Sequence, residues 1–294
     1  MKNPLKGIKG IKVIADENLA RHTSFHIGGR ATHFVYVYTK RALRIVLARI
    51  HLLKMRYFLI GAGTNLLVAD RGFEGVVLKL GGVFKRVSHR GCLFRCGGGV
   101  LIKDFLDVAI SACCAGAEFM AGIPGTLGGA VKGNAGAFGY SVSDLLKNVI
   151  VMDRNGTESL RTNGEIGFAY RHSEIRDGDI IITIYLKLKE ERRSKILARV
   201  KANLASRQEK HPTEYSAGSF FKNPPGRAAG ELIEHCGLKG LSVGGAQVSE
   251  KHANYLINRG QACANDILAL AGKVKKIVRA KTGIRLEEEV IILK

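Results

Sequence analysis

Three kinds of polar group lie within one short segment, SAGSFFKNP at 216–224, where Ser219, Lys222 and Asn223 supply a hydroxyl, an ammonium and an amide. Such a set can bind an anionic substrate and give it a proton. Serine is a poor acid, so neighbouring cations would have to stabilise its conjugate base. The alternative is a polar turn between two domains.

Two glycine-rich segments are suited to main-chain contact with a ligand. AGIPGTLGGAVKGNAGAFG, at 121–139, holds seven glycines in nineteen residues, and GAGTN spans 61–65. GAGTN lacks the third glycine of GxGxxG, and the chain has no GxxxxGKS or GxxxxGKT. The backbone N–H groups of the two loops could still cradle one pyrophosphate from both sides. A flexible linker and a simple tight turn are the alternatives.

Two further polar groups are candidates for chemistry. YRHS, at 170–173, contains Arg171, and Glu287, Glu288 and Glu289 precede a short apolar run near the carboxyl terminus. An arginine can bind a carboxylate through two hydrogen bonds and hold a developing enolate. A surface ion pair is the ordinary alternative for either group.

The apolar pattern predicts alternating strands and helices that position these residues. The expected strands are 34–38, 57–60, 76–80, 149–153, 180–188 and 289–293. The expected helices lie at 43–53, 103–114, 196–204, 228–236 and 266–279. The run of strand, helix, strand and glycine turn that ends in GAGTN is the usual way an α/β unit delivers a loop to a ligand. A proline and a change of composition place a domain boundary near 190–210.

Composition fits a globular protein with two cores: 294 residues, 46% of them hydrophobic. No run of about 18 apolar residues and no signal peptide is found, so we expect a cytoplasmic protein without membrane insertion. The six cysteines match no zinc spacing, and we expect reduced thiols and no metal ion. The net charge of +21 suggests an anionic partner. Scattered basic residues without aromatic interleaving favour polyphosphorylated small molecules over nucleic acid.

Taken in order, the motifs resemble the UDP-N-acetylenolpyruvoylglucosamine reductase (MurB) family, in its shorter form. The matching segments are HTSFHIGG at 22–29, GAGTNLLV at 61–68, GIPGTLGGA at 122–130, GNAGAFG at 133–139, YRHS, AGSFFKNP at 217–224 and LEEEV at 286–290. They cover nearly the whole chain. With the two glycine-rich pieces at 122–130 and 133–139 counted as one motif, six motifs in the right order are far more specific than any one of them.

The resemblance implies an α+β fold: a two-part FAD-binding module of the vanillyl-alcohol oxidase/PCMH type, followed by a C-terminal α+β substrate-binding domain. We expect the FAD-binding region at 1–190, with subdomains at about 1–80 and 81–190. The substrate domain is expected at 191–294, with the last strand a candidate to return to the FAD-binding region.

The implied activity is that of UDP-N-acetylmuramate dehydrogenase (EC 1.3.1.98), an FAD-dependent oxidoreductase of peptidoglycan synthesis and cell-wall biogenesis, and hence linked to cell shape, division and cycle. It reduces UDP-N-acetylglucosamine-enolpyruvate to UDP-N-acetylmuramate with NADPH as hydride donor. The FAD is expected to be noncovalent and the protein a monomer that binds no nucleic acid. The residues themselves do not determine the oligomeric state or the preference between NADPH and NADH.

The resemblance also assigns residues. Ser219 matches the proton donor, and Arg171 and Glu289 match the pair that stabilises an enolate-like intermediate. The FAD contacts carry over to Gly61, Ala62, Gly63, Thr64, Asn65, Gly122, Ile123, Pro124, Gly125, Thr126, Gly128, Asn134, Ala135 and Gly136. Substrate contacts are expected from Tyr170, Arg207, Lys210, Lys222 and Asn223.

Some features depart from the family pattern. The net charge is higher, His26 stands where arginine is common, and LEEEV has a glutamate in its middle position. A one-residue slip along the last strand would point Glu287 or Glu288 inward instead of Glu289. The competing hypotheses are another flavin oxidoreductase of the same fold, acting on a hydroxy acid or sugar, and a basic binding protein that has lost catalysis.

Overall fold

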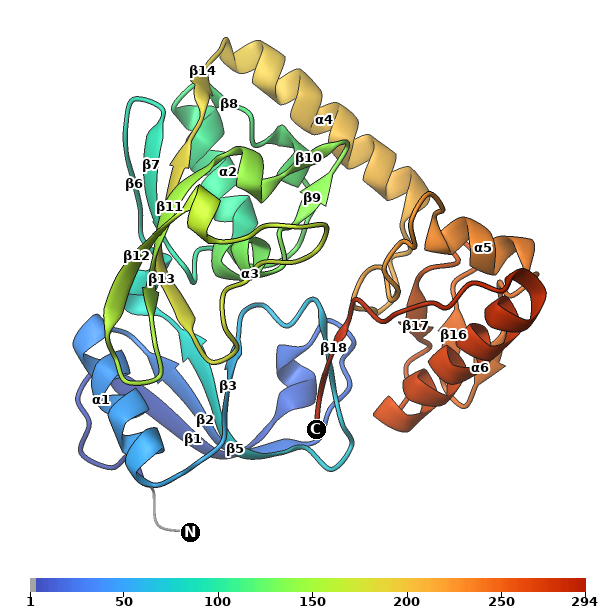
Figure 1. Ribbon diagram of the computed structural model, residues 1–294, viewed down its shortest axis with the longest axis horizontal. Helices are drawn as coiled ribbons and strands as arrows, with labels where there is room; N and C mark the ends of the chain where they lie inside the picture. Colours follow the sequence, from blue (N-terminus) through green and yellow to red (C-terminus); the bar gives the residue numbers. More distant parts are fainter. Residues whose placement is uncertain (1–3) are drawn as a thin grey trace. The chain divides into compact units, whose positions relative to one another are not determined.

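The computed structural model describes residues 4–294, which form two compact units. The first unit comprises the described residues up to Asp16, together with Thr32–Gly61 and Glu74–Ser206. The second comprises Glu17–Ala31, Ala62–Phe73 and Arg207–Lys294. Both units mix helices with strands (Figure 1).

One sheet of the first unit has four strands in the order β1-β2-β5-β3, with β3 and β5 parallel. Helix α1 packs against it because Leu43, Val46, Leu47 and Ile50 form one buried face. The side chain of Thr39 accepts a hydrogen bond from the Ala42 N–H and so begins this helix. The bounds are β1 Ile11–Asn18, β2 Arg30–Val37, α1 Lys40–Leu52, β3 Tyr57–Ile60 and β5 Phe73–Leu80.

The other large sheet is antiparallel, in the order β12-β11-β13-β7-β6, and packs on α2 and α3 through a second core. Its strands are β6 Val87–Arg90, β7 Leu93–Gly97, β11 Leu146–Met152, β12 Glu158–Thr162 and β13 Ile180–Lys187. The other α-helices of this unit are α2 Ile102–Ser111, α3 Leu127–Lys132 and α4 Arg193–Lys210, of which α4 runs on into residues of the second unit.

Helix α2 is shorter than the apolar pattern predicts. The helix was expected to reach Cys114, but Cys113 adopts a left-handed φ of 55° and Cys114 begins the short strand β8, Cys114–Ala115. Strand β8 pairs with β14, Lys189–Glu190. The pairing between distant residues therefore overrides the local apolar spacing.

The second unit has its own core, formed by helices α5 and α6 and a three-stranded sheet. The helices are Ala229–His235 and Ala264–Thr282, and the strands are β15 Ser242–Val243, β16 Ala246–Val248 and β17 Leu256–Asn258. A separate pair joins β18, Ile291–Leu293, in parallel to β4, Leu66–Val68. The last strand of the chain thus pairs with a segment that follows GAGTN.

The two units differ from the contiguous split that the sequence suggests. The stretches 17–31 and 62–73 belong to the second unit, because they bond to its residues. The Asn258 side chain, for example, donates to the Phe25 carbonyl at 2.9 Å, and the Ser24 N–H donates to the Gly63 carbonyl at 3.0 Å. Within residues 4–294, no helix is long and apolar enough to cross a bilayer.

Candidate active site

Two glycines of the predicted cofactor segments lie where neighbouring atoms approach too closely for a Cβ atom. A Cβ on Gly61 would come within 2.7 Å of the Thr126 Oγ1, and one on Gly128 within 2.6 Å of the Gly98 carbonyl oxygen. Thr126 also accepts a hydrogen bond from the Gly129 N–H at 3.2 Å and so begins α3. The 121–139 segment is therefore a packed loop, and a flexible linker is excluded.

Several backbone N–H groups of these loops fit the phosphates of a nucleotide cofactor. In the part of the chain that the structure describes, no acceptor is found for the N–H groups of Gly122, Gly125 and Thr126 in the first unit. The same holds for Ala62 and Gly63 in the second unit. Neighbouring amides that have no protein acceptor form an anion-binding concavity. Each loop, taken by itself, thus offers N–H donors of the kind that bind phosphate oxygens.

Arg171 lies in a tight turn that the glycine-rich loop holds. Ala169 and His172 exchange two backbone hydrogen bonds of 3.1 Å, which place Tyr170 and Arg171 at the tip. Arg171 has a left-handed φ of 54°, an uncommon conformation for a residue with a Cβ. Its Nη2 donates to the Gly136 carbonyl at 2.9 Å. This predicted enolate-binding arginine is therefore oriented by the predicted cofactor loop.

Asn134 fixes the same turn from the loop side. Its Nδ2 donates to the Ala169 carbonyl at 3.0 Å, and its Oδ1 accepts from the Ser143 N–H at 3.3 Å. The residue is 8% exposed and has a φ of 42°. Asn134 was predicted to contact FAD, and the structure shows in addition that its side chain ties the loop to the Arg171 turn.

Ser219 lies in an extended segment of the second unit. It pairs in antiparallel fashion with Tyr255, and the next two residues are fixed by Asn254. The Phe220 N–H donates to the Asn254 carbonyl at 2.7 Å, and the Asn254 side chain bonds to both backbone groups of Phe221, at 2.9 and 2.8 Å. Since Asn254 is 2% exposed, these bonds are shielded from water and hold Ser219 in place.

The glutamates near the carboxyl terminus run beside the same segment. The Glu289 N–H donates to the Phe220 carbonyl at 2.8 Å, so the structure brings Ser219 and Glu289 together. The Glu288 carboxylate instead contacts the Lys275 ammonium of α6, at 2.8 and 3.1 Å. Exposed Glu287 lies 3.7 Å from the Lys222 Nζ. Because the Glu288 carboxylate contacts α6, it is not available on the Ser219 side, and the choice of Glu289 stays a prediction.

Lys222 and Asn223 are held by different contacts. The Lys222 N–H donates to the Glu287 carbonyl at 2.8 Å, which extends the pairing of the two segments. The Asn223 Oδ1 accepts from the Ala229 N–H at 3.0 Å, at the first residue of α5. Asn223 therefore stabilises a helix end as well as being a predicted substrate contact, and its Nδ2 keeps its two N–H donors for a ligand.

A buried polar cluster beside Ser219 was not foreseen from the sequence. The Tyr255 hydroxyl lies 2.9 Å from the His211 Nδ1, and the ring of His252 packs against both rings. These residues belong to no short motif. The only available signal was that His211 directly follows Lys210, and Tyr255 precedes an apolar strand.

The pKa values of His211 and Tyr255 in this cluster differ from their ordinary values. Burial lowers the pKa of His211 to about 4, and the charges of Arg207, His252, Lys251 and Lys210 act in the same direction. Burial raises the pKa of Tyr255 to about 12; Arg207 opposes this rise and Glu289 adds to it. At neutral pH the hydroxyl and the imidazole are therefore both uncharged, and the tautomer of His211 decides which of the two donates. Arg207 and Glu289 both lie near enough to Tyr255 to act on its charge.

The predicted site residues therefore fall into two sets. The first unit holds Gly61, the loop 122–136 and the Tyr170–Arg171 turn. The second unit holds Ala62–Asn65, Arg207, Lys210, Ser219–Asn223 and Glu289. In the second set, the Asn65 Nδ2 donates to the Glu289 carbonyl at 3.2 Å, so GAGTN and the LEEEV segment meet directly.

Known protein families match regions of the chain that contain residues of both sets. A family model for the C-terminal domain of UDP-N-acetylenolpyruvoylglucosamine reductase matches residues 210–293, and one for an FAD binding domain matches 31–159. A UDP-N-acetylenolpyruvoylglucosamine reductase of Caldanaerobacter subterraneus subsp. tengcongensis is 38% identical over 288 residues, which cover 97% of this chain and 95% of that protein.

Two solved structures are also similar. The crystal structure of UDP-N-acetylenolpyruvylglucosamine reductase (MurB) from Thermus caldophilus has a TM-score of 0.83 and 34% identity, over 97% of this chain and 99% of that one. Physcomitrella patens BBE-like 1 has a TM-score of 0.57 at 13% identity, over 94% and 88% of the two chains, which is a likeness of fold alone. The predicted fold class, α+β with an FAD-binding module, is confirmed.

Proposed function

The chain belongs to the UDP-N-acetylenolpyruvoylglucosamine reductase family, and we propose that it reduces UDP-N-acetylglucosamine-enolpyruvate to UDP-N-acetylmuramate, with FAD as cofactor and NADPH as hydride donor. The structural observation that carries the proposal is the pairing of the AGSFFKNP segment with the Glu289 strand and with Tyr255. The segments that carry Ser219, Lys222 and Glu289, a hydroxyl, one cation and a carboxylate of the family motifs, belong to one unit, which supports the proposal.

When bound, FAD supplies a flavin that accepts a hydride from the nicotinamide and passes it to the substrate double bond. The residues that would hold it are the glycine loops, whose unbonded N–H groups suit its pyrophosphate. A Cβ on Gly61 would clash with the Thr126 side chain, so the close packing of these two loop residues requires glycine at this position. Nothing in either loop offers a covalent attachment, in keeping with noncovalent FAD.

The basic residues of the second unit are proposed to bind the substrate. Arg207 and Lys210 end helix α4, where cations also offset the negative end of the helix dipole. A diphosphate is a suitable ligand for this pair. Lys222 and Asn223 supply further donors, and Tyr170 is 55% exposed at the tip of its turn, available for contact with the substrate.

Ser219 is proposed to give a proton to C2 of the enolpyruvyl group after hydride has reached C3. Negative charge then resides on the carboxylate-bearing carbon, and the Arg171 guanidinium stabilises it. Glu289 is proposed to act with Arg171 in stabilising this charge, as the family resemblance implies. The alkoxide of Ser219 is a strong base, and Arg207, whose charge acts on the neighbouring Tyr255, is proposed to lower the cost of the proton transfer.

The finer assignments are part of the same proposal. They are the use of NADPH rather than NADH, the classification EC 1.3.1.98, action in the cytoplasm as a monomer, and a contribution to cell division through wall synthesis. The support is family membership over nearly the full length of the relative. The alternative of a hydroxy acid or sugar oxidoreductase is not favoured, because the two similar proteins named above at more than 30% identity are both UDP-N-acetylenolpyruvoylglucosamine reductases.

The proposal is tested by following NADPH oxidation in the presence and absence of UDP-N-acetylglucosamine-enolpyruvate. We expect a yellow protein whose NADPH consumption depends on that substrate and yields UDP-N-acetylmuramate, detected by mass spectrometry. A protein that binds FAD but consumes NADPH equally well without the substrate would sink the proposal. A repeat with NADH tests the nucleotide preference.

A further inference from the structure

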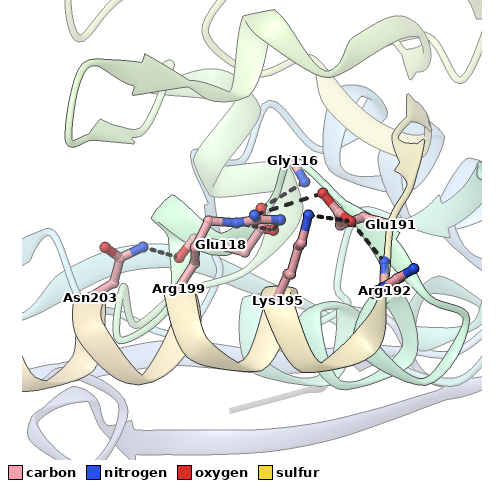
Figure 2. Close-up of polar contacts among 7 residues, drawn as sticks. All are labelled: Gly116, Glu118, Glu191, Arg192, Lys195, Arg199 and Asn203. Atoms are coloured by element: carbon pink, nitrogen blue, oxygen red, sulfur yellow. Dashed lines mark hydrogen bonds and ion pairs between the residues drawn. The ribbon is translucent and has the colours of Figure 1, made fainter.

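Glu118 is a buried carboxylate directly before the glycine-rich loop, in the short 3₁₀ helix Glu118–Met120. Its side chain is 8% exposed, and a charge so well shielded requires partners. Figure 2 shows where they come from: the Arg199 and Asn203 side chains on α4, and the backbone of Gly116. None of these residues belongs to a motif of the family resemblance.

The contacts of Glu118 use both of its carboxylate oxygens. The Oε1 accepts from the Arg199 Nε at 3.0 Å and from its Nη2 at 2.7 Å, and the Oε2 accepts from the Gly116 N–H at 2.6 Å. An arginine that gives two hydrogen bonds fixes direction as well as charge. The Glu118 side chain therefore locks the 3₁₀ helix to one face of α4.

The backbone of Glu118 is held in the same place. Its carbonyl oxygen accepts from the Asn203 Nδ2 at 2.8 Å and from the Ala121 N–H at 3.0 Å. Ala121 is the first residue of the glycine-rich loop, so α4 and the loop share one acceptor. Because the Ala121 N–H bonds to the Glu118 carbonyl, the position of this carbonyl affects the position of the first loop residue.

The far end of the loop returns to the same 3₁₀ helix. Tyr140, which follows Gly139, stacks on the ring of Phe119 with centroids 6.1 Å apart. Phe119 and Met120 are buried, at 3% and 0% exposure, in the core of the first unit. The 3₁₀ helix is thus a common anchor for both ends of the proposed FAD loop.

We propose that Glu118 is a positioning residue for the flavin cofactor: with Arg199 and Asn203 it sets the conformation in which the loop amides of Gly122, Gly125 and Thr126 face the FAD pyrophosphate. This inference rests on the proposed function. Glycine-rich backbone has many conformations of similar energy, so its binding geometry depends on what anchors its ends.

The test is the dissociation constant of FAD, measured by fluorescence titration of flavin-free protein at 25 °C. We expect Glu118→Gln and Arg199→Met to weaken FAD binding by about tenfold or more, and Arg199→Lys, which keeps the charge but not the two-pronged geometry, to lie between them and wild type. Asn203→Leu, which removes only the carbonyl bond, is expected to weaken binding about threefold. The variants' flavin absorption spectra should shift as the loop loosens.

A matched control is Glu191→Gln. Glu191 faces the same stretch of α4 through longer ion pairs, 3.9 Å to the Lys195 Nζ and 4.0 Å to the Arg199 Nη1, but does not touch the loop anchor (Figure 2). This variant should bind FAD as wild type does. If Arg199→Lys and Asn203→Leu lower the melting temperature yet leave the FAD dissociation constant and spectrum unchanged, Glu118 is only structural and the inference is overturned. Wild-type protein that takes up no FAD would instead refute the proposed function.

Discussion

At the scale of single residues, the site depends on where polar groups are held rather than on how many there are. Ser219 carries no unusual chemistry in itself, but the buried Asn254 and the paired Tyr255 fix the backbone on either side of it. Arg171 is held in a strained left-handed conformation by contacts with the cofactor loop. Position therefore supplies much of the catalysis proposed here.

Ser219→Ala separates the two halves of the reaction. The variant should be reduced by NADPH at nearly the wild-type rate, because hydride uptake needs no proton from the serine. Reoxidation by the substrate should slow by about 10²- to 10⁴-fold. Stopped-flow absorbance of the flavin measures both rates. Ser216→Ala, in the same segment, serves as the control, and equal damage to both half-reactions would contradict the role given to Ser219.

The register of the three glutamates gives a paired prediction. Glu289→Gln should slow substrate reduction strongly while the fold remains intact. Glu288→Gln removes only the partly exposed ion pair with Lys275, so its turnover should match wild type and its stability should change by about 1 kcal/mol or less. Turnover and urea unfolding of both variants check this. A large loss of turnover in Glu288→Gln alone would show that the other carboxylate serves the reaction.

The partly buried His211 predicts a pH dependence of stability. Its folded pKa of about 4 lies below the ordinary 6.5, so the unfolded chain binds the proton more readily. The stabilising contribution is present above pH 6.5 and is lost as the pH falls towards 4. His252, whose pKa burial also lowers, acts in the same direction. Urea unfolding measures the free energy of unfolding at pH 7.5 and at pH 5. The decrease between these two pH values should be smaller for His211→Gln than for wild type. An equal decrease would show that His211 does not cause the pH dependence.

At the scale of elements, much of the local structure is predictable from apolar spacing. The strand expected at 57–60 and the helices around 43–53 and 266–279 are found within a few residues of those positions. The glycine loops were also identified, because their composition alone departs from that of a helix or strand. The contacts that stabilise them were not predictable: Glu118 meets Arg199 across 81 residues, and Ser219 meets Tyr255 through a bridge without any sequence signature.

Helix α6 is an example of an element that is stabilised by a residue distant in sequence, Asp70. Its two carboxylate oxygens accept from the N–H groups of Ala264 and Asn265, at 2.7 and 3.0 Å, in the first turn of α6. Asp70→Ala should therefore cost about 1–2 kcal/mol of unfolding free energy. Urea denaturation measures it, with Glu234→Gln, which breaks an exposed ion pair with Lys239, as the control. A variant as stable as wild type would mean that α6 does not depend on this cap.

At the scale of the whole molecule, the chain divides its functional residues between two units that interleave in sequence. Short stretches such as Ala62–Phe73 join the second unit through backbone pairing, including β4 with β18. Residue composition along the chain indicates a domain boundary only where the residue types change. It therefore does not reveal that a short stretch such as Ala62–Phe73 belongs to the second unit. The net charge of +21 remains larger than the proposed site requires, and in the reaction it would favour the approach of a diphosphate substrate.

The central claim is that this molecule transfers a hydride from its reduced flavin to an enolpyruvyl ether. The most direct measurement mixes anaerobically reduced holoprotein with UDP-N-acetylglucosamine-enolpyruvate and follows the oxidised flavin absorbance near 450 nm, about where flavins absorb. Rapid reappearance of that absorbance, with one UDP-N-acetylmuramate formed per flavin, is the predicted result. A flavin that stays reduced until oxygen is admitted would contradict the account.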